Sequence, residues 1–212
     1  MLQKYFAHFS TAALMGRYYD RFMTDIEEKV LLKRRKKLFA GLQVHILEIG
    51  TGTGINLGLF PEDTRVTGFE PNLYMLEHAR QREAFINEPQ RFRLYNLKAE
   101  EGTNILQDAA PFDALVLTLV LCTVAQPEDL VRRLLPLLRQ GAPIIVLEHI
   151  IDPHPVIRLG QRLFNPFWKR CAEGCHLTRP TDKMLKNIGL KATQTEYFRV
   201  GLTFYQSVMY KP

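Results

Sequence analysis

Cysteine is scarce in this chain of 212 residues, and the sequence contains no long apolar run. The three cysteines, Cys122, Cys171 and Cys175, are too few and too odd in number for a disulfide framework, which favours a reducing cytoplasm. The longest nearly continuous apolar stretch, residues 114–125, is well short of the ~18–20 residues that a membrane-spanning helix requires. Residues 1–20 lack a compact apolar core followed by a cleavage site, so we expect no secretory signal peptide.

The remaining composition, with 46% hydrophobic and 24% charged residues, is that of an ordinary globular protein. It excludes disordered and collagen-like classes, and the length predicts one domain, because single cores typically grow to roughly 100–200 residues. The net charge is +6 and the pI about 9.3, so an anionic partner must be considered. Much of the excess lies in the basic tract Lys33–Lys37, for which we favour a solvated helix face over an anionic membrane or nucleic acid contact.

Apolar periodicity divides the chain into a helical beginning and a longer alternating region. Residues 1–40 have apolar side chains near a 3.6-residue period, among them Phe6, Phe9 and Phe22, which predicts N-terminal helices. Short apolar runs then predict five strands with two helices between them: strands at 44–49, 65–70, 93–97, 113–119 and 143–150, and helices at 72–86 and 128–139. Strands that alternate with helices predict a parallel sheet with helices on both faces.

The end of the chain has a different pattern. A short helix is expected at 181–190, with Thr181 as its N-cap and Gly189 at its end. Two strands follow at 192–200 and 202–210, separated by a single glycine. Strands joined so closely must pair antiparallel, because a parallel crossover needs about a dozen residues or more. The predicted fold is therefore α/β and doubly wound, with a mostly parallel seven-stranded sheet that ends in an antiparallel hairpin.

The most informative segment is ILEIGTGTG, residues 46–54, in which an apolar strand runs into three glycines at alternate positions. Gly50, Gly52 and Gly54 let the backbone adopt positive φ and pass close to a ligand. The dinucleotide fingerprint GxGxxG is not matched, because its third glycine falls on an isoleucine. Glu48 precedes the loop, and its carboxylate would repel a pyrophosphate but attract an α-ammonium group.

A second acid, Glu70, ends the next strand, 16 residues after Gly54. A carboxylate at that place can accept hydrogen bonds from both hydroxyls of a ribose. The segment EPNLYML then begins a helix, with Pro71 near its first position and the apolar Met75 and Leu76 placed to cover an adenine. S-adenosylmethionine suits both acids, because it has an ammonium, a sulfonium and a ribose but no phosphate.

The stretches EIGTGTGINL and FEPN, with the closing hairpin, resemble class I S-adenosylmethionine-dependent methyltransferases over nearly the whole chain. KKLFAGLQ, LTLVLCTV, LEHI and GCHLTR further resemble the methyltransferase-like family whose animal members methylate small thiols. The resemblance implies a Rossmann-like fold with extra N-terminal helices and S-adenosylmethionine as cofactor. We expect one methyltransferase domain over 1–212, with four parts: a helical cap at 1–40, a cofactor-binding core at 41–150, a substrate or lid segment at 151–190 and the hairpin at 191–212.

By this resemblance the glycine loop lines the methionine part of the cofactor, Glu48 faces the loop and the ammonium, and Glu70 holds the ribose. Residues after the third strand would lie beside the adenine, and the end of the fourth strand would lie under the methyl donor. The expected cofactor contacts are Glu48, Gly50, Thr51, Gly52, Gly54, Asn56, Glu70, Pro71, Asn72, Met75, Ala99, Glu100, Thr118, Leu119 and Val120.

Methyl transfer is an in-line displacement, so alignment and exclusion of water are the main tasks of the protein. With a thiolate acceptor, a cation and an anion become neutral products, and the apolar segment LTLVLCTV would favour that loss of charge. His149 is the candidate proton acceptor or substrate contact, because it titrates near neutrality and ends the fifth strand, although a structural histidine is equally consistent. Glu148 either orients His149 or points the other way.

Further candidate substrate contacts are Tyr19 in the N-terminal helices, Trp168 in an aromatic cluster with Phe164 and Phe167, and His176 and Arg179 before the hairpin. Cys122 is interpreted as a packed small hydrophobe, because direct methyl transfer needs no covalent intermediate. Cys171 and Cys175 fall four residues apart on an expected helix. A zinc site needs four ligands and no CxxC pair is present, so we expect no metal.

Three alternatives to thiol methylation of a small molecule are considered. Enzymes that methylate exocyclic base amines usually carry (D/N)PP(F/Y/W) at the end of strand four, where this chain has TLVL, so a nucleic-acid partner is not expected. A phospholipid or small-amine N-methyltransferase is the main alternative, because the N-terminal helix and the basic tract can adsorb peripherally to anionic lipid. A non-enzymatic binder would not need both acids and all three glycines. The sequence leaves the oligomeric state open.

Overall fold

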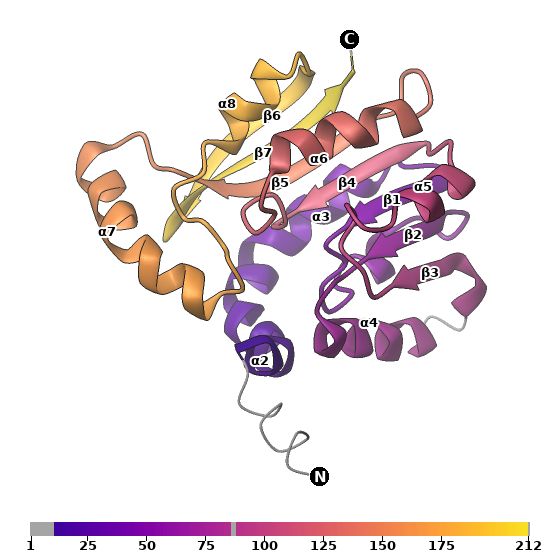
Figure 1. Ribbon diagram of the computed structural model, residues 1–212, viewed down its shortest axis with the longest axis horizontal. Coiled ribbons are helices and arrows are strands. Elements are labelled where there is room, and N and C mark those ends of the chain that lie inside the picture. The colour runs from indigo at the N-terminus through magenta and orange to yellow at the C-terminus, as the bar shows by residue number, and fades with distance from the viewer. Residues whose placement is uncertain (1–10, 86–87, 212) are drawn as a thin grey trace. The chain divides into compact units, whose positions relative to one another are not determined.

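The computed structural model describes residues 11–85 and 88–211 (Figure 1). The chain divides into two compact units, residues 1–102 and 103–212. The expected helical residues Phe6 and Phe9 lie outside the described residues. Among the residues that are described, no helix is both long and apolar enough to cross a lipid bilayer.

The first unit contains three parallel strands and the N-terminal helices. Its elements are α2 (Thr11–Ile26), the π-helical turn η1 (Glu27–Leu31), α3 (Leu32–Phe39), β1 (His45–Ile49), the short turn η2 (Leu57–Leu59), β2 (Arg65–Phe69), α4 (Leu73–Phe85), the turn η3 (Pro89–Arg91) and β3 (Phe92–Tyr95). β2 pairs in parallel with β1 on one side and with β3 on the other. β1 is buried from Ile46 to its end, as expected for a strand covered on both faces.

The second unit carries the remaining strands and ends in the hairpin. Its elements are α5 (Thr103–Ala109), β4 (Ala114–Thr118), α6 (Pro127–Leu134), the turn η4 (Leu135–Leu137), β5 (Ile144–Ile150), α7 (Pro155–Cys171), α8 (Thr181–Asn187), β6 (Lys191–Val200) and β7 (Leu202–Tyr210). β4 and β5 are parallel and buried throughout, as their continuous apolar runs predict. β7 pairs antiparallel with both β5 and β6, and α6 and α8 lie over the strands in Figure 1.

The strands follow the order β3-β2-β1-β4-β5-β7-β6 in a seven-stranded sheet. Parallel pairs followed by an antiparallel hairpin confirm the predicted fold class. The predicted strands and helices agree with the observed ones to within two residues at most ends. The exceptions are α5 and α7, which periodicity did not predict, and the expected helix at 128–139, which ends at Leu134 and continues as the turn η4.

Two predicted helix starts are wrong by one or two residues. Thr181 is the first residue of α8, and Pro180 holds the N-cap position instead. Pro71 precedes the start of α4, and Asn72 caps that helix, because its side-chain Oδ1 accepts hydrogen bonds from the backbone N–H groups of Tyr74 (2.9 Å) and Met75 (3.3 Å). In both cases a proline with fixed φ lies outside the helix rather than at its first position.

The sequence suggested that the basic tract is a solvated helix face. The structure shows that only part of the tract is exposed. Lys33, Lys36 and Lys37 are exposed, but Arg35 between them is buried. Its Nε donates to Glu27 Oε1 at 2.7 Å, and its Nη1 donates to Asn56 Oδ1, also at 2.7 Å. The central arginine of the tract therefore ties the N-terminal helices to the residues that follow the glycine loop.

Replacing Arg35 should destabilise the protein much more than replacing its neighbour. Arg35→Ala leaves the buried Glu27 carboxylate without its cation, so we expect the free energy of unfolding to fall by about 3–5 kcal/mol. Lys36→Ala removes an exposed charge of the same tract and should change it by less than about 0.5 kcal/mol. Urea unfolding followed by circular dichroism measures both values, and equal losses would contradict the buried ion pair.

Candidate active site

The glycine loop leaves β1 in a conformation that needs glycine. Gly50, Gly52 and Gly54 have φ values of 72°, 58° and 78°. The backbone N–H groups of Gly50 and Thr51 both donate to the carbonyl oxygen of Phe69, at 2.8 and 3.2 Å, so the loop is fixed to the end of β2.

The second and third glycines serve different purposes. A Cβ atom at Gly54 would lie 2.9 Å from the Cα atom of Ala79, so this glycine allows the loop to pack closely on α4. A Cβ atom at Gly52 would meet only the Gly50 carbonyl oxygen, at 3.9 Å. Gly52 therefore borders open space, and a ligand can approach the backbone there.

Glu70 joins the loop to the start of α4. Its carboxylate is buried, with Oε2 accepting from the backbone N–H of Gly52 at 2.9 Å and Oε1 accepting from that of Asn72 at 2.8 Å. These two bonds fix the Glu70 carboxylate between the glycine loop and the start of α4.

Glu48 is a fully buried carboxylate beneath the loop. Its Oε1 accepts from Asn56 Nδ2 at 2.6 Å, whereas Oε2 makes no hydrogen bond with any described residue. Burial raises the pKa of Glu48 to about 7, although the Asn56 bond and the charge of Arg35 oppose the shift. A buried acceptor without a partner is costly, and a cationic group of a ligand would satisfy it. The buried carboxylate of Glu48 thus fits the α-ammonium of S-adenosylmethionine.

An N-terminal helix also contacts the glycine loop. Asp20 of α2 accepts from the Thr53 hydroxyl at 2.5 Å and pairs with Arg82 of α4. Tyr19, a predicted substrate contact, directly precedes Asp20 in the sequence, and its side chain is half-buried. The sequence did not identify Arg35 as part of this region, because its partner Asn56 lies 21 positions away in the chain.

The other predicted cofactor residues of this unit vary in exposure. Met75 and Ala99 are buried, Glu100 is half-buried and Pro71 is exposed. The predicted contacts Thr118, Leu119 and Val120 belong to the second unit, where they form the end of β4 and its following loop.

Glu148 of β5 fixes the loop after β4. This buried carboxylate accepts from the backbone N–H groups of Val120 (2.7 Å) and Leu121 (2.8 Å) through Oε1. Burial raises its pKa to about 7, while the charge of His149 and the two backbone bonds oppose that shift. Leu119 has a φ of 55°, a left-handed conformation that is uncommon for leucine. Glu148 therefore holds this loop, and among the described residues its carboxylate makes no hydrogen bond that orients the His149 ring.

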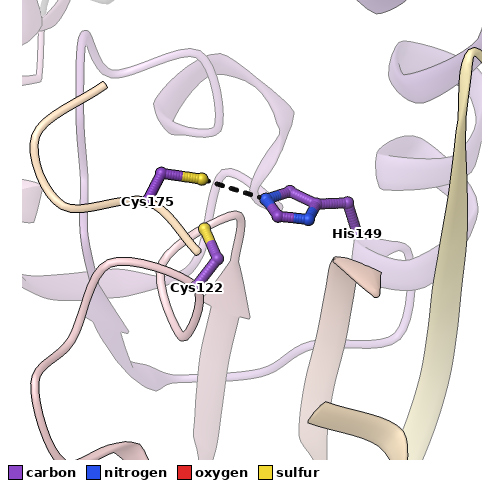
Figure 2. Close-up of side chains that lie close together, drawn as sticks. All are labelled: Cys122, His149 and Cys175. Atoms are coloured by element: carbon purple, nitrogen blue, oxygen red, sulfur yellow. Dashed lines mark hydrogen bonds between the residues drawn. The ribbon is translucent and has the colours of Figure 1, made fainter. Parts of the chain in front are cut away.

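Three buried side chains from separate segments meet in this unit (Figure 2). They are Cys122 in the loop after β4, His149 at the end of β5 and Cys175 after α7. His149 Nε2 lies 3.1 Å from Cys175 Sγ, and the ligand atoms of all three lie within 4.8 Å of one another. We call them the Cys–His cluster. The expectation that Cys171 and Cys175 share a helix is wrong, because α7 ends at the exposed Cys171.

The Cys–His cluster has a polarised charge distribution. The hydrogen bond from Cys122 lowers the pKa of Cys175, and the bond and charge of His149 add to this effect against the cost of burial. Burial disfavours the charged His149 ring, but its bond to Cys175 and the sulfur's negative charge raise the pKa of His149 above its usual value. The Cys175 bond and burial raise the pKa of Cys122. Cys175 therefore carries the thiolate character of the cluster.

The remaining predicted substrate residues surround this cluster. The His176 backbone N–H donates to the Cys122 carbonyl oxygen at 2.9 Å, and Arg179 Nη1 donates to the carbonyl oxygens of Leu121 and Val124. Trp168 belongs to α7, and the centroid of its ring lies 6.1 Å from that of Phe164. The segment before the hairpin thus fixes the loop that carries Cys122, and Arg179 has a structural role there.

The sequence of this chain is similar to those of known methyltransferases. A methyltransferase domain model matches residues 47–144. Human thiol S-methyltransferase TMT1B is 29% identical over 188 residues, which cover 84% of this chain and 76% of that protein. A phosphatidylethanolamine N-methyltransferase of Cereibacter sphaeroides is 28% identical over 104 residues, 49% of this chain and 50% of that protein.

Solved structures show the same fold. An O-methyltransferase family protein from Burkholderia thailandensis superposes with a TM-score of 0.72 at 10% identity. The alignment covers 96% of this chain, which spans 63% of that protein's length. Together with the methyltransferase domain match and the curated relatives, the fold and the glycine loop support a class I S-adenosylmethionine-dependent methyltransferase.

Proposed function

We propose that this protein transfers a methyl group from S-adenosylmethionine to a small, fairly apolar thiol. S-adenosylmethionine as the cofactor is supported by the buried Glu48 carboxylate beneath the glycine loop. Its Oε2 atom has no hydrogen-bond partner among the described residues. The acceptor side is supported by the similarity to human thiol S-methyltransferase TMT1B over most of the chain. When bound, S-adenosylmethionine supplies an electrophilic methyl group on a sulfonium.

The first unit is proposed to hold the cofactor. The carboxylate of Glu48 would bind the α-ammonium, and the carboxylate of Glu70 would bind the ribose hydroxyls. The open side of Gly52 lets the methionine part approach the backbone. Thr51 and Asn56 support the loop, and the remaining predicted contacts are proposed to line the adenine: Pro71, Asn72, Met75, Ala99 and Glu100.

The second unit is proposed to bind the acceptor. The end of β4 and its loop are apolar and buried around Leu117, Leu121 and Cys122. Such a wall favours a reaction in which a cation and an anion give neutral products, because charge is lost on the way to the transition state. His149 Nδ1 is buried and makes no hydrogen bond with a described residue, so it remains the candidate proton acceptor for a thiol.

A phospholipid N-methyltransferase at a membrane surface is the second candidate. The helix α7 exposes large apolar side chains at helical spacing and also carries Arg158 and Arg162, a combination typical of a helix that lies in a membrane interface. The exposed side chains are Val156, Leu159, Leu163 and Phe167. The similarity to the phosphatidylethanolamine enzyme covers only half of this chain, so the thiol is preferred.

An acceptor panel separates these two functions. The protein is incubated with methyl-labelled S-adenosylmethionine and, in separate reactions, ethanethiol, ethylamine, ethanol or vesicles of phosphatidylethanolamine with phosphatidylglycerol. We expect turnover with the thiol at least about tenfold above the amine, because an apolar site favours the acceptor that loses its charge. Labelled phospholipid without labelled thioether would reverse the assignment.

Gly52→Val should remove cofactor binding and leave the protein folded. A valine side chain would fill the open side of the loop, so we expect the affinity for S-adenosylhomocysteine to fall roughly a hundredfold or more, about 2.8 kcal/mol. Gly141→Val is the matched control, since Gly141 also has a positive φ, 75°, and nothing lies within 4 Å of its Cβ position. Both variants should lose a similar amount of stability in thermal unfolding, and only the first should lose calorimetric binding. Undiminished binding by Gly52→Val would refute the assignment of the loop.

Cofactor affinity should increase with pH because of Glu48. Its pKa is raised to about 7 by burial, so the carboxylate is mostly neutral at pH 6 and mostly charged at pH 8. If only the charged form attracts the α-ammonium, the affinity for S-adenosylhomocysteine should rise about tenfold over this range. Glu48→Gln should bind weakly at both pH values and remove the rise. Calorimetric titrations at the two pH values measure this, and an equal rise in the variant would assign the effect to another group.

A further inference from the structure

We propose that Cys122, His149 and Cys175 form a zinc site, and that the sulfur of the acceptor thiol takes its fourth coordination position. The metal-binding part stands on the geometry of the Cys–His cluster alone. The part that concerns the acceptor rests on the proposed thiol methylation. Neither part was expected from the sequence, which lacks a CxxC pair.

The geometry of the cluster matches the needs of zinc. In a tetrahedral site, Zn–S bonds of about 2.3 Å and Zn–N bonds of about 2.0 Å separate two sulfur atoms by about 3.8 Å and a sulfur from a nitrogen by about 3.5 Å. The two Sγ atoms and the ring nitrogen lie within 4.8 Å of one another, and Nε2 lies 3.1 Å from the Cys175 sulfur. An ion therefore fits between them with side-chain shifts of roughly half an ångström.

The type of ligand selects the metal. Two thiolates and an imidazole are soft donors that favour zinc over magnesium or calcium. Zn²⁺ with two thiolates and a neutral imidazole also has no net charge, which suits a site whose three side chains are all at most 8% exposed.

The backbone around the cluster is fixed before any ion binds. The His176 N–H and the Arg179 guanidinium hold the loop that carries Cys122, and Glu148 holds the same loop from β5. His149 is paired in the β5–β7 ladder opposite Phe204. Ligands on a rigid frame lose little conformational freedom when the metal binds, which favours a preformed site.

The number of ligands points to a catalytic rather than a structural site. Among the described residues the cluster supplies three possible ligands, whereas a structural zinc site is closed by four protein ligands. Three ligands leave a position for water or substrate. There an acceptor thiol would displace the water, release its proton to solvent and bind as a thiolate. Its sulfur would then form the bond to the methyl carbon, while the bond from that carbon to the sulfonium sulfur breaks and leaves the electron pair on S-adenosylhomocysteine.

Metal analysis of the full chain tests the site itself. The protein is purified with a phosphine reductant, exposed to zinc sulfate and dialysed, and its zinc is measured by mass spectrometry. We expect about one zinc per chain, and about a tenfold or larger decrease in Cys122→Ser, Cys175→Ser and His149→Gln. Cys171→Ser is the matched control and should keep its zinc, because Cys171 is exposed and lies outside the cluster. Circular dichroism and binding of S-adenosylhomocysteine report whether each variant is folded.

Cobalt substitution tests the ligands and the open position. Cobalt-loaded protein should show thiolate-to-metal charge-transfer absorption in the near ultraviolet, with visible bands of a four-coordinate ion. Cys171→Ser should keep the charge-transfer absorption, and the variants of the two cluster cysteines should lose about half of it or more. Ethanethiol should shift the visible bands, whereas ethanol at the same concentration should not.

The possible results separate the inference from the proposed function. Wild-type protein that binds no zinc, retains zinc in the three cluster variants, or contains a Cys122–Cys175 disulfide after reduction would overturn the metal site, even where ethanethiol is methylated. Bound zinc with visible bands that ethanethiol does not shift would overturn the open position for the acceptor. A zinc-loaded protein that responds to ethanethiol but methylates only amines would sustain the site and refute the proposed function.

Discussion

Each unit of this chain is organised by a buried glutamate. Its carboxylate accepts hydrogen bonds from backbone N–H groups of the loop that follows the adjacent strand. In the first unit, Glu70 follows β2 and binds the Gly52 N–H after β1. In the second, Glu148 of β5 binds the Val120 and Leu121 N–H groups after β4. Adjacent parallel strands end at the same edge, so a carboxylate at one end reaches the loop of the other. Both loops are thereby fixed where ligands of such sheets bind.

A buried carboxylate without full hydrogen bonding weakens the folded state, and Glu48 is such a group. Three contacts limit this cost: the Asn56 amide donates to it, Arg35 holds Asn56, and Glu27 holds Arg35. The N-terminal helices therefore influence the electrostatic environment of Glu48 through Arg35 and Asn56, without a hydrogen bond to Glu48 itself. A cationic ligand relieves the remaining cost, so binding energy and fold stability are linked at this residue.

The sequence predicted the parts of the fold that local patterns determine. Strands at the apolar runs, the hairpin around Gly201 and the glycine loop all follow from short-range periodicity or spacing. It could not predict that Arg35 is buried, because the tract around it is basic and its partners Glu27 and Asn56 are 8 and 21 positions away. The sequence did not predict the Cys–His cluster for the same reason: His149 and Cys175 are 26 positions apart, and the fold rather than their spacing brings them together.

The geometry of the Cys–His cluster connects metal binding with the acceptor chemistry. His149 Nε2 already lies 3.1 Å from the Cys175 sulfur, so this ring nitrogen is occupied within the cluster. A divalent ion bound there would replace the protons that its ligands carry. It would also acidify a bound thiol, as metals acidify bound water. A site of this kind therefore needs no free histidine base, and it gives a function to the two cysteines that lie beside His149.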